Sequence, residues 1–127
     1  MITQGTYLNV VDNSGAKKAY CIRIIKGYKS RYAFVGDTIL VSIQKLRSHR
    51  KSFSKVKTGE LYQAVIVRTR LKESTYKGDS YKFLENAIVL LNKQNKFIGT
   101  RVFGTVPKIF RYTKYMRLIS ISSGLVS

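Results

Sequence analysis

The sequence predicts a mainly β fold, a small barrel or sandwich followed by a short helical C-terminal part. About six short segments rich in Val, Ile and Tyr alternate apolar and polar residues, which is the pattern of half-buried strands. Turn-forming residues separate these segments, and the period changes to that of a helix after Pro107. Closure into a barrel is favoured because an open edge of short strands would invite aggregation.

The first three predicted strands lie in the first 45 residues. The segment "TYLNVVD" (6–12) precedes a turn at "NSG", and "AYCIRIIKG" (19–27) follows it. In "DTILVSIQK" (37–45), Ile39, Val41 and Ile43 share one face, which we expect to face the core. The single cysteine, Cys21, cannot form an internal disulfide, and its place on a strand predicts a small buried side chain.

The later strands carry different signals. In "LYQAVIVRTR" (61–70), alternation is expected to direct Arg68 and Arg70 outward. The segment "AIVLLN" (87–92) is nearly all apolar, as expected for a strand covered on both faces. The segment "NKQNK" (92–96) predicts a hairpin turn into "FIGTRVFG" (97–104), whose two glycines bracket a short strand bearing Arg101.

The C-terminal part follows Pro107. There Ile109, Tyr112, Met116 and Ile119 recur at helical spacing, which predicts one amphipathic helix or two short ones packed on the barrel. We expect a single domain over residues 1–127, with the barrel and hairpins at 1–106, short helices at 107–122 and a frayed tail at 123–127.

The charge of the chain narrows the function. Lys and Arg number 24 against six Asp and Glu, a net charge of +18 at pH 7. Residues 1–60 and residues 61–127 each hold 12 basic and three acidic side chains, so the charge belongs to the whole fold. This favours a polyanionic partner over a single short ligand. The alternative is a basic secreted or membrane-surface protein, but no apolar run is long enough to span a bilayer and no signal peptide is visible.

Two segments concentrate the cations. Residues 45–57, "KLRSHRKSFSKVK", contain no acid and predict a self-repelling loop that reaches away from the barrel towards phosphates, or else a solvated hairpin without a ligand. Residues 27–37, "GYKSRYAFVGD", interleave Lys29 and Arg31 with aromatic rings that could stack on unpaired bases. For Phe34 the capping of the barrel core is the favoured interpretation.

An enzyme is not expected. The chain has one histidine, and its six acids are scattered rather than clustered. Four of them, Asp12, Asp37, Glu60 and Asp79, lie at predicted turns, where hydrogen bonding to the backbone explains them. We find no metal-ligand spacing, no phosphate-binding glycine loop and no nucleophile motif, so neither metal nor cofactor is expected.

Several motifs together resemble one family. In order, "LNVVDNSGAKKAYCIRI", "RYAFVGDTI", "AVIVRTR", "NAIVLLN", "IGTRVFG" and "KYMRLISIS" are similar to the universal ribosomal large-subunit protein fourteen (L-fourteen) family, over about residues 1–122. The resemblance implies a five-stranded β-barrel with a projecting β-ribbon or basic loop and a short helical C-terminal part. It also implies a structural, non-catalytic protein that binds large-subunit rRNA at the face that meets the small subunit. An OB-like single-stranded nucleic-acid-binding protein acting outside the ribosome is the alternative.

The resemblance also assigns candidate residues. Contacts with large-subunit rRNA are implied at Lys17, Lys18, Arg23, Lys29, Arg31 and Tyr32, to which the outward alternation adds Arg68 and Arg70. Contacts with small-subunit rRNA are implied in the loop from Gln44 to Phe53 and in the tail from Ile119 to Ser122, with candidates Lys45, Arg47, His49, Arg50, Lys51, Ile119 and Ser120. The surface for protein partners is implied at Thr100 and Arg101, with Lys114 and Arg117 as further candidates.

The implied protein partners are neighbouring large-subunit proteins of the nineteen and three families, and a ribosome-silencing factor that blocks subunit joining.

The amino-acid composition favours one compartment over another. Lys outnumbers Arg, Tyr and Phe are plentiful, and Pro and Trp are nearly absent, as AT-rich coding would produce. This favours a mitochondrial ribosome and an organelle-encoded gene, with the cytoplasm of an AT-rich bacterium as the alternative.

Overall fold

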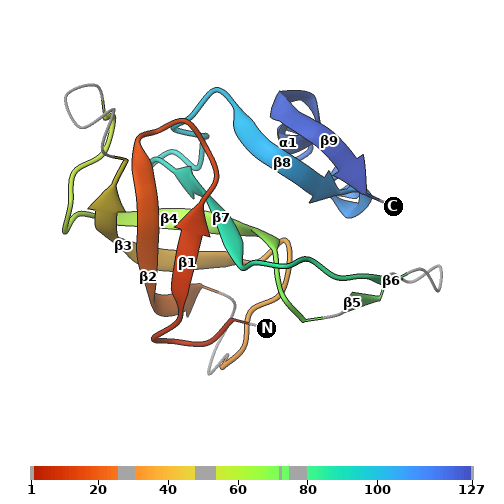
Figure 1. The fold of residues 1–127 in the computed structure, drawn as a ribbon, viewed down its shortest axis with the longest axis horizontal. Helices are drawn as coiled ribbons and strands as arrows, with labels where there is room; N and C mark the ends of the chain where they lie inside the picture. Colours follow the sequence, from red (N-terminus) through yellow and green to blue (C-terminus); the bar gives the residue numbers. More distant parts are fainter. Residues whose placement is uncertain (1, 26–30, 48–53, 72, 75–79, 127) are drawn as a thin grey trace.

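Five strands close into a barrel in the computed structural model of the chain, which describes residues 2–25, 31–47, 54–71, 73–74 and 80–126. The barrel strands are β1 (Tyr7–Val10), β2 (Ala16–Ile25), β3 (Thr38–Leu46), β4 (Leu61–Arg68) and β7 (Ala87–Leu91). Neighbours pair antiparallel except β1 and β7, which close the barrel in parallel (Figure 1). The predicted mainly β fold and its closure are confirmed.

The inward face predicted for β3 forms part of the core. Ile39, Val41 and Ile43 are fully buried, and so is Cys21 on β2, where burial raises the pKa of the thiol. Phe34, which was expected to cap the core, is 37% exposed, whereas Ala33 and Val35 on either side of it are buried. The capping role of Phe34 therefore stays a prediction.

The strand β7 is covered on both faces, as predicted from its apolar run. All five of its residues are buried. One face lies inside the barrel, and the segment that follows the strand pairs with the edge that β7 leaves open beyond its pairing with β1. Leu91 pairs with Phe97 in an isolated bridge, and the N–H of Ile98 donates to the carbonyl of Leu90 at 3.3 Å. The predicted turn at 92–96 is also present, with the side chain of Asn92 accepting two backbone N–H groups.

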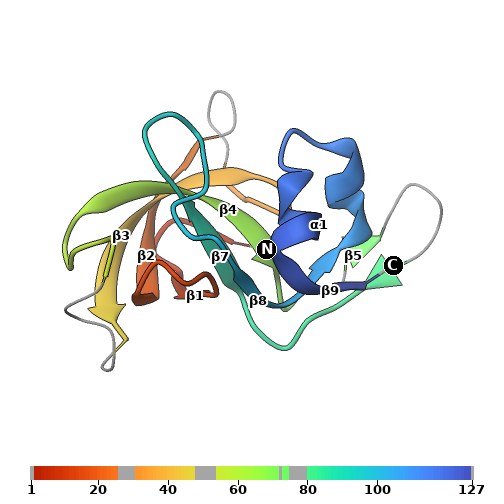
Figure 2. The same cartoon turned by 90° about the horizontal axis from the view of Figure 1, so that it is seen from above.

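The C-terminal part forms a second small sheet. The strand β8 (Val102–Pro107) leads into the 3₁₀ helix η2 (Lys108–Tyr112) and the helix α1 (Arg117–Ile121), and β9 (Ser122–Val126) then pairs parallel with β8 (Figure 2). The predicted frayed tail is therefore wrong. Parallel strands need a crossover of a dozen or more residues, and the two short helices supply it, so the last residues return alongside β8 and take up its hydrogen bonds.

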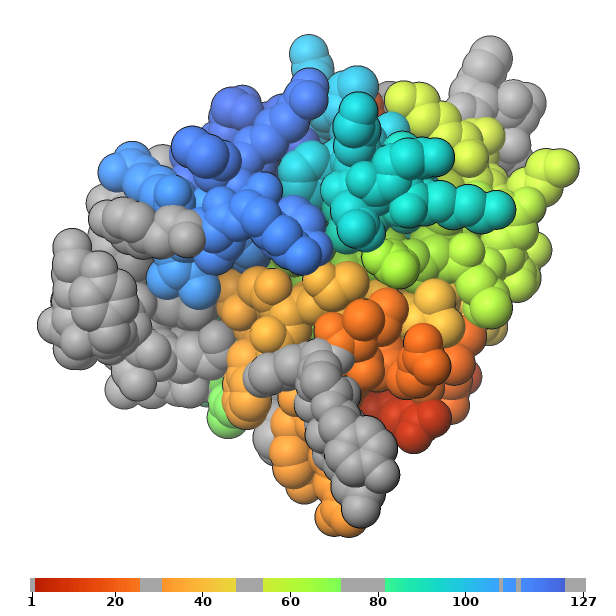
Figure 3. All heavy atoms as spheres, turned by 180° about the vertical axis from the view of Figure 1, so that it is seen from behind, coloured from red at the N-terminus to blue at the C-terminus, as the bar shows by residue number. Residues whose placement is uncertain are grey.

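Two short helices are present, and the predicted helical face is correct only in part. Ile109 and Ile119 are partly buried against the core. Met116 is 62% exposed instead, and the buried side chains are Phe110, Tyr115 and Leu118. A 3₁₀ turn and a break between the helices shift the face, because neither follows the α-helical period. The rings of Phe97 and Tyr115 lie 6.1 Å apart, and Figure 3 shows the turn at 92–96 packed beside the C-terminal part.

A narrow ribbon extends between β4 and β7. It pairs β5 (Glu73–Ser74) with β6 (Ser80–Tyr81) and projects from the barrel (Figures 1 and 2). Two-residue strands are too short for alternation to predict, and only the family resemblance implied a projecting ribbon.

Candidate nucleic-acid interface

A buried carboxylate holds the turn between β1 and β2. The Oδ1 atom of Asp12 accepts hydrogen bonds from the backbone N–H of Ser14, at 3.1 Å, and from the Ser14 hydroxyl. The Oδ2 atom accepts the N–H of Leu90 at 3.0 Å. Gly15 has a φ of +106°, and a Cβ at that position would lie 2.5 Å from the hydroxyl oxygen of Ser54. The turn is therefore fixed by its own contacts, and only glycine fits at its end.

The two adjacent lysines after this turn both face solvent. In a regular strand Lys17 and Lys18 would point to opposite faces. Here the register with β3 shifts on both sides of Lys18, and both side chains are exposed between the buried residues Ala16 and Ala19. A β-bulge re-aims side chains in this way. Both adjacent lysines of the strand are therefore exposed to solvent.

Like charges meet across this surface. Lys18 of β2 is the register partner of Lys45 of β3, and Asn9 of β1 pairs with Lys18 from the other side. Like charges directly opposite each other destabilise a sheet. Within the described ranges, no carboxylate pairs with Lys17, Lys18 or Lys45. Lys18 and Lys45 therefore form a row of two cations across β2 and β3. Within the described part of the chain, no carboxylate neutralises their charge.

The basic segment 45–57 is anchored at both ends to the same turn. The N–H of Arg47 donates to the carbonyl of Gly15 at 2.8 Å, and the N–H of Lys55 donates to the carbonyl of Ser14 at 2.9 Å. Val56 is buried in the core. Three bridge candidates, His49, Arg50 and Lys51, lie outside the described residues. The base of the segment is thus a fixed part of the barrel.

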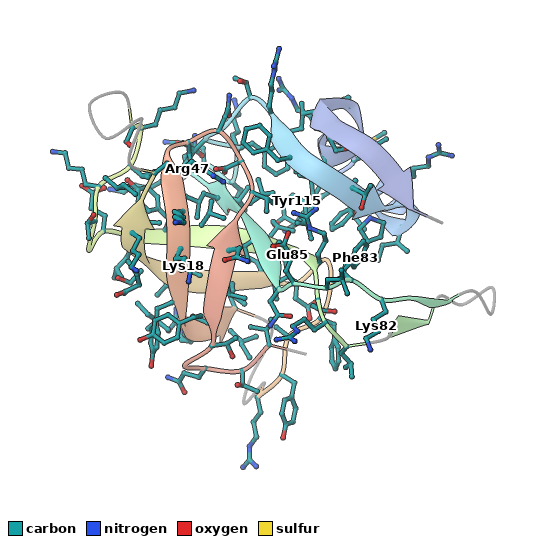
Figure 4. All side chains as sticks on the ribbon, in the orientation of Figure 1. Lys18, Arg47, Lys82, Phe83, Glu85 and Tyr115 are labelled. Atoms are coloured by element: carbon teal, nitrogen blue, oxygen red, sulfur yellow. The ribbon has the colours of Figure 1, made fainter. Side chains whose placement is uncertain are left out.

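The side chain of Arg47 packs against the barrel. It is half-buried, its Nη2 donates to the carbonyl of Val10 at 3.0 Å, and its guanidinium lies 5.6 Å from the ring centroid of Phe103. Figure 4 shows Arg47 near the start of β2. With Lys17 it lines a hollow of about 350 Å³. Arg47 therefore joins β3 to β8, although the sequence placed it in a loop reaching away from the barrel.

Arg68 and Arg70 do not point outward together as predicted. Arg68 is 7% exposed, and its Nη2 lies 3.0 Å from Oε1 of Glu85. Burial lowers the pKa of its guanidinium, and the charge of Glu85 acts in the opposite direction. Its other terminal nitrogen fits against Gly104, where an added Cβ would lie 2.0 Å away. The C-terminal sheet covers this end of β4, so Arg68 is turned into a packed site, whereas Arg70 beyond the strand is exposed.

The remaining rRNA candidates lie at other points of the surface. Arg23 of β2, Arg31 and Tyr32 are exposed, and Tyr32 is 49% exposed. Lys29 lies outside the described residues. A third register shift, between Cys21 and Arg23, turns Arg23 outward while Ile24 stays buried. The structure therefore presents these cations without gathering them into the row at Lys18.

Asn13, which sequence reasoning missed, ties two candidate surfaces together. Its Oδ1 accepts the N–H groups of Thr100 and Arg101 at 2.7 and 3.2 Å, and its Nδ2 donates to Oγ1 of Thr100 at 2.9 Å. The segment of the predicted protein-partner surface is thus held by the turn that precedes Lys17. An Asn beside Asp in a turn indicates local backbone capping, but its partners in sequence-distant residues could not be read from that signal.

The other C-terminal candidates are dispersed. Lys114 is exposed, with its Nζ 5.2 Å from the ring centroid of Tyr115, and Arg117 is exposed on α1. Ser120 lines a hollow of about 430 Å³ together with Thr100 and Arg101. Ile119 is partly buried against the core. The structure therefore joins Ser120, a candidate for small-subunit contact, to the candidates for protein contact.

The comparison with protein families identifies the chain. The family model described as "Ribosomal protein L14p/L23e" matches residues 1–126.

The chain belongs to the ribosomal protein L14p/L23e family.

Membership gives the chain a structural, non-enzymatic role in the large ribosomal subunit, with rRNA and ribosomal proteins as its classes of partner. Among the described residues there is no group of three or more His, Cys, Asp or Glu that could hold a metal ion. No helix in the described ranges is long and apolar enough to cross a bilayer.

Proposed function

We propose that this L14p/L23e protein binds large-subunit rRNA through the bulged start of β2 and the surfaces around it. The observation that carries the proposal is the row at Lys18 and Lys45, two cations in register without a carboxylate partner in the described part of the chain. Phosphates would relieve the repulsion between them. Lys17, Arg23, Lys29, Arg31, Tyr32 and Arg70 extend this candidate surface. The buried Arg68 contributes to this candidate surface indirectly, because its ion pair holds the side chain of Glu85 in place.

The bridge to the small subunit is proposed for the segment from Gln44 to Phe53 and for Ile119 to Ser122. The first is supported by the rigid base at Arg47 and Lys55, from which the basic residues Lys45, His49, Arg50 and Lys51 continue. Because the base is fixed, cations near it lose less freedom on binding than cations of a free tail. The second is supported by the exposure of Ser120 on α1.

A surface for neighbouring proteins is proposed at Thr100 and Arg101, with Lys114 and Arg117 as further candidates. Its support is the bracket formed by Asn13, which holds the backbone at Thr100 and Arg101 in place. Large-subunit proteins of the nineteen and three families and a ribosome-silencing factor are the proposed partners.

A mitochondrial ribosome is the proposed compartment. Its support is the composition, which is of the kind that AT-rich coding produces.

Co-sedimentation tests the function. The chain is expected to remain with large subunits at moderate salt, whereas a single-stranded nucleic-acid binder that acts outside the ribosome would leave them.

A loop variant tests the role of the basic segment in subunit joining. Replacing the basic residues of 45–57 by Ala, except the packed Arg47, should weaken subunit joining as salt rises while the melting temperature stays constant. Unchanged joining, or an unfolded variant, would overturn the role given to this segment. The matched control replaces Lys93 and Lys96, two exposed lysines on the turn at 92–96.

A further inference from the structure

A small hollow opens on the outside of the barrel, where β1 and β2 meet the chain entering β7. Its volume is about 250 Å³. Small-molecule sites usually span about 300–1,000 Å³, so this hollow suits one group of a longer ligand. Figure 4 shows Lys18 on β2 and Glu85 before β7, two of its lining residues. The lining residues that matter here are Tyr7, Asn9, Lys18, Arg70, Leu84 and Glu85.

The hollow has an exposed aromatic wall. The side chain of Tyr7 is 65% exposed, and its ring makes an edge contact with Tyr20 at a centroid distance of 5.1 Å and an interplanar angle of 68°. In such a pair one ring offers its edge to the face of the other. Whichever ring offers its edge, at least one face of Tyr7 is left uncovered by Tyr20. Leu84, 94% exposed, adds apolar surface to the same hollow.

The acidic group of the hollow has partners within the fold, whereas its two cations have no carboxylate partner in the described residues. Glu85 is held at both oxygens, by Arg68 at 3.0 Å and by the side-chain amide of Asn9 at 2.9 Å. The charge of Arg68 behind the wall therefore offsets the one carboxylate that lines it. Lys18 and Arg70 have no carboxylate partner within the described part of the chain. The hollow thus combines a free aromatic face with two unmatched cations.

We infer that this hollow receives one unpaired RNA base, which stacks on Tyr7 while Lys18 and Arg70 hold the phosphates on either side of it. The inference rests on the proposed function, whose rRNA supplies the ligand, and adds that the RNA here is single-stranded. Base stacking on an exposed ring, with cations along the backbone, is the chemistry by which proteins bind unpaired strands. A duplex keeps the faces of its bases inside the helix and cannot use the ring. An acidic peptide could use the cations but would gain little from the ring.

A tryptophan probe tests the stacking directly. The chain contains no Trp, so Tyr7→Trp places a unique fluorophore in the hollow. We expect short oligo(U) and oligo(A), and large-subunit rRNA, to quench it. An RNA duplex without overhangs and a poly-glutamate peptide should leave it unchanged. Tyr7→Leu should weaken oligonucleotide binding about 5- to 150-fold, the equivalent of a stack worth about 1–3 kcal/mol, and Tyr7→Phe should retain binding.

Matched variants separate stacking from general attraction. Leu61→Trp places a fluorophore at a site that is 58% exposed, in an apolar hollow of about 360 Å³ whose cation is Lys93. It should show little quenching by single strands. Lys18→Gln and Arg70→Gln should each reduce the salt slope of oligonucleotide binding by about 0.7. Circular dichroism and melting temperatures confirm that each variant keeps its fold, and Tyr7→Phe provides the comparison should Tyr7→Leu unfold.

The outcomes separate this inference from the proposed function. Binding of large-subunit rRNA without quenching at position 7, or with equal affinity for Tyr7→Leu, overturns the base site and leaves the function standing. Equal quenching by duplex, by poly-glutamate or at position 61 also overturns it, because it shows attraction without stacking. Failure of the wild-type chain to bind large-subunit rRNA overturns the proposed function and the base site together. Selective quenching with the loss in Tyr7→Leu supports the site.

Discussion

The start of β2 and the end of β4 each carry two cations, and the structure treats the two pairs differently. At the start of β2, the bulge turns both Lys17 and Lys18 into solvent. At the end of β4, where the register with β7 also shifts, Arg68 is buried against Glu85 while Arg70 is exposed. An ion pair with a carboxylate makes the difference. Arg68 has one and became part of the fold, whereas Lys18 faces Lys45 and has none in the described ranges.

Arg68→Met should break the comparison most strongly. It removes a buried guanidinium and leaves Glu85 without its ion-pair partner. We expect a loss of about 2–3 kcal/mol in the free energy of unfolding, below the roughly 3–5 kcal/mol for fully buried pairs. The reason for the smaller loss is that the side chain of Glu85 is 41% exposed. Urea denaturation measures it. Arg70→Met is the control and should change stability by less than about 0.5 kcal/mol, and equal effects of the two variants would contradict a structural role for Arg68.

Gly104→Ala should show that the guanidinium of Arg68 is held in place. Gly104 has a φ of +87° and its Cβ would meet Nη1 of Arg68 at 2.0 Å, whereas Gly36 has a φ of +93° and no atom within 4 Å of a Cβ. Both substitutions carry the backbone cost of roughly 1 kcal/mol. We expect Gly104→Ala to lose about 1 kcal/mol more, because Arg68 must shift. Thermal melts of the two variants measure this difference, and its absence would mean that Arg68 moves freely.

Asp12→Asn should sharpen the comparison through pH. Burial raises the pKa of the Asp12 carboxyl, against its hydrogen bonds and the charge of Arg47. A carboxyl with a raised folded-state pKa loses stability as pH rises from its unfolded value of 3.8 through its folded value. At neutral pH the variant should lose about 1–2 kcal/mol, because Leu90 N–H would face an amide donor. Since Asn does not titrate, the deficit relative to the wild type should grow on acidification. A deficit independent of pH would contradict a raised pKa.

Lys18→Gln should have the smallest effect on stability, with the opposite sign. Removing one of two facing lysines is expected to stabilise the fold by about 0.2–0.5 kcal/mol at low salt, and the gain should vanish at high salt. Chemical denaturation at two ionic strengths measures it. Lys57→Gln, at an exposed lysine outside the strands, is the control and should give no comparable gain. A salt-independent loss of stability would mean that Lys18 has a partner in the fold.

Alternation predicted what a two-residue period can determine. It identified the apolar face of β3. The covered β7 was predicted from its apolar run instead, and the closure of the barrel from the aggregation that open edges invite. Alternation failed at the end of β4, where both faces are covered and Arg68 meets a carboxylate that is distant in sequence. It also missed β9, whose Ser and Gly residues have weak strand propensity and are ordered by pairing with β8.

The candidate surface was predictable as a set of cations but not as an arrangement. The pair Lys17 and Lys18 was visible in the sequence, whereas their common exposure depends on a bulge. The inward packing of Arg47 on Phe103 depends on the approach of β8, which no local pattern encodes. The hydrogen bonds of Asn13 to Thr100 and Arg101 likewise join segments far apart in the chain.

The salt dependence of binding to large-subunit rRNA tests the central claim, that unmatched cations bind RNA while matched ones hold the fold. We expect the double variant Lys17→Gln and Lys18→Gln to fold and to melt at the wild-type temperature at high salt, or slightly above it at low salt, where the repulsion between Lys18 and Lys45 is relieved. The slope of log K against log salt should fall by about 1.4–1.8, because two phosphate contacts are lost. An unchanged slope with an unchanged fold would contradict the account.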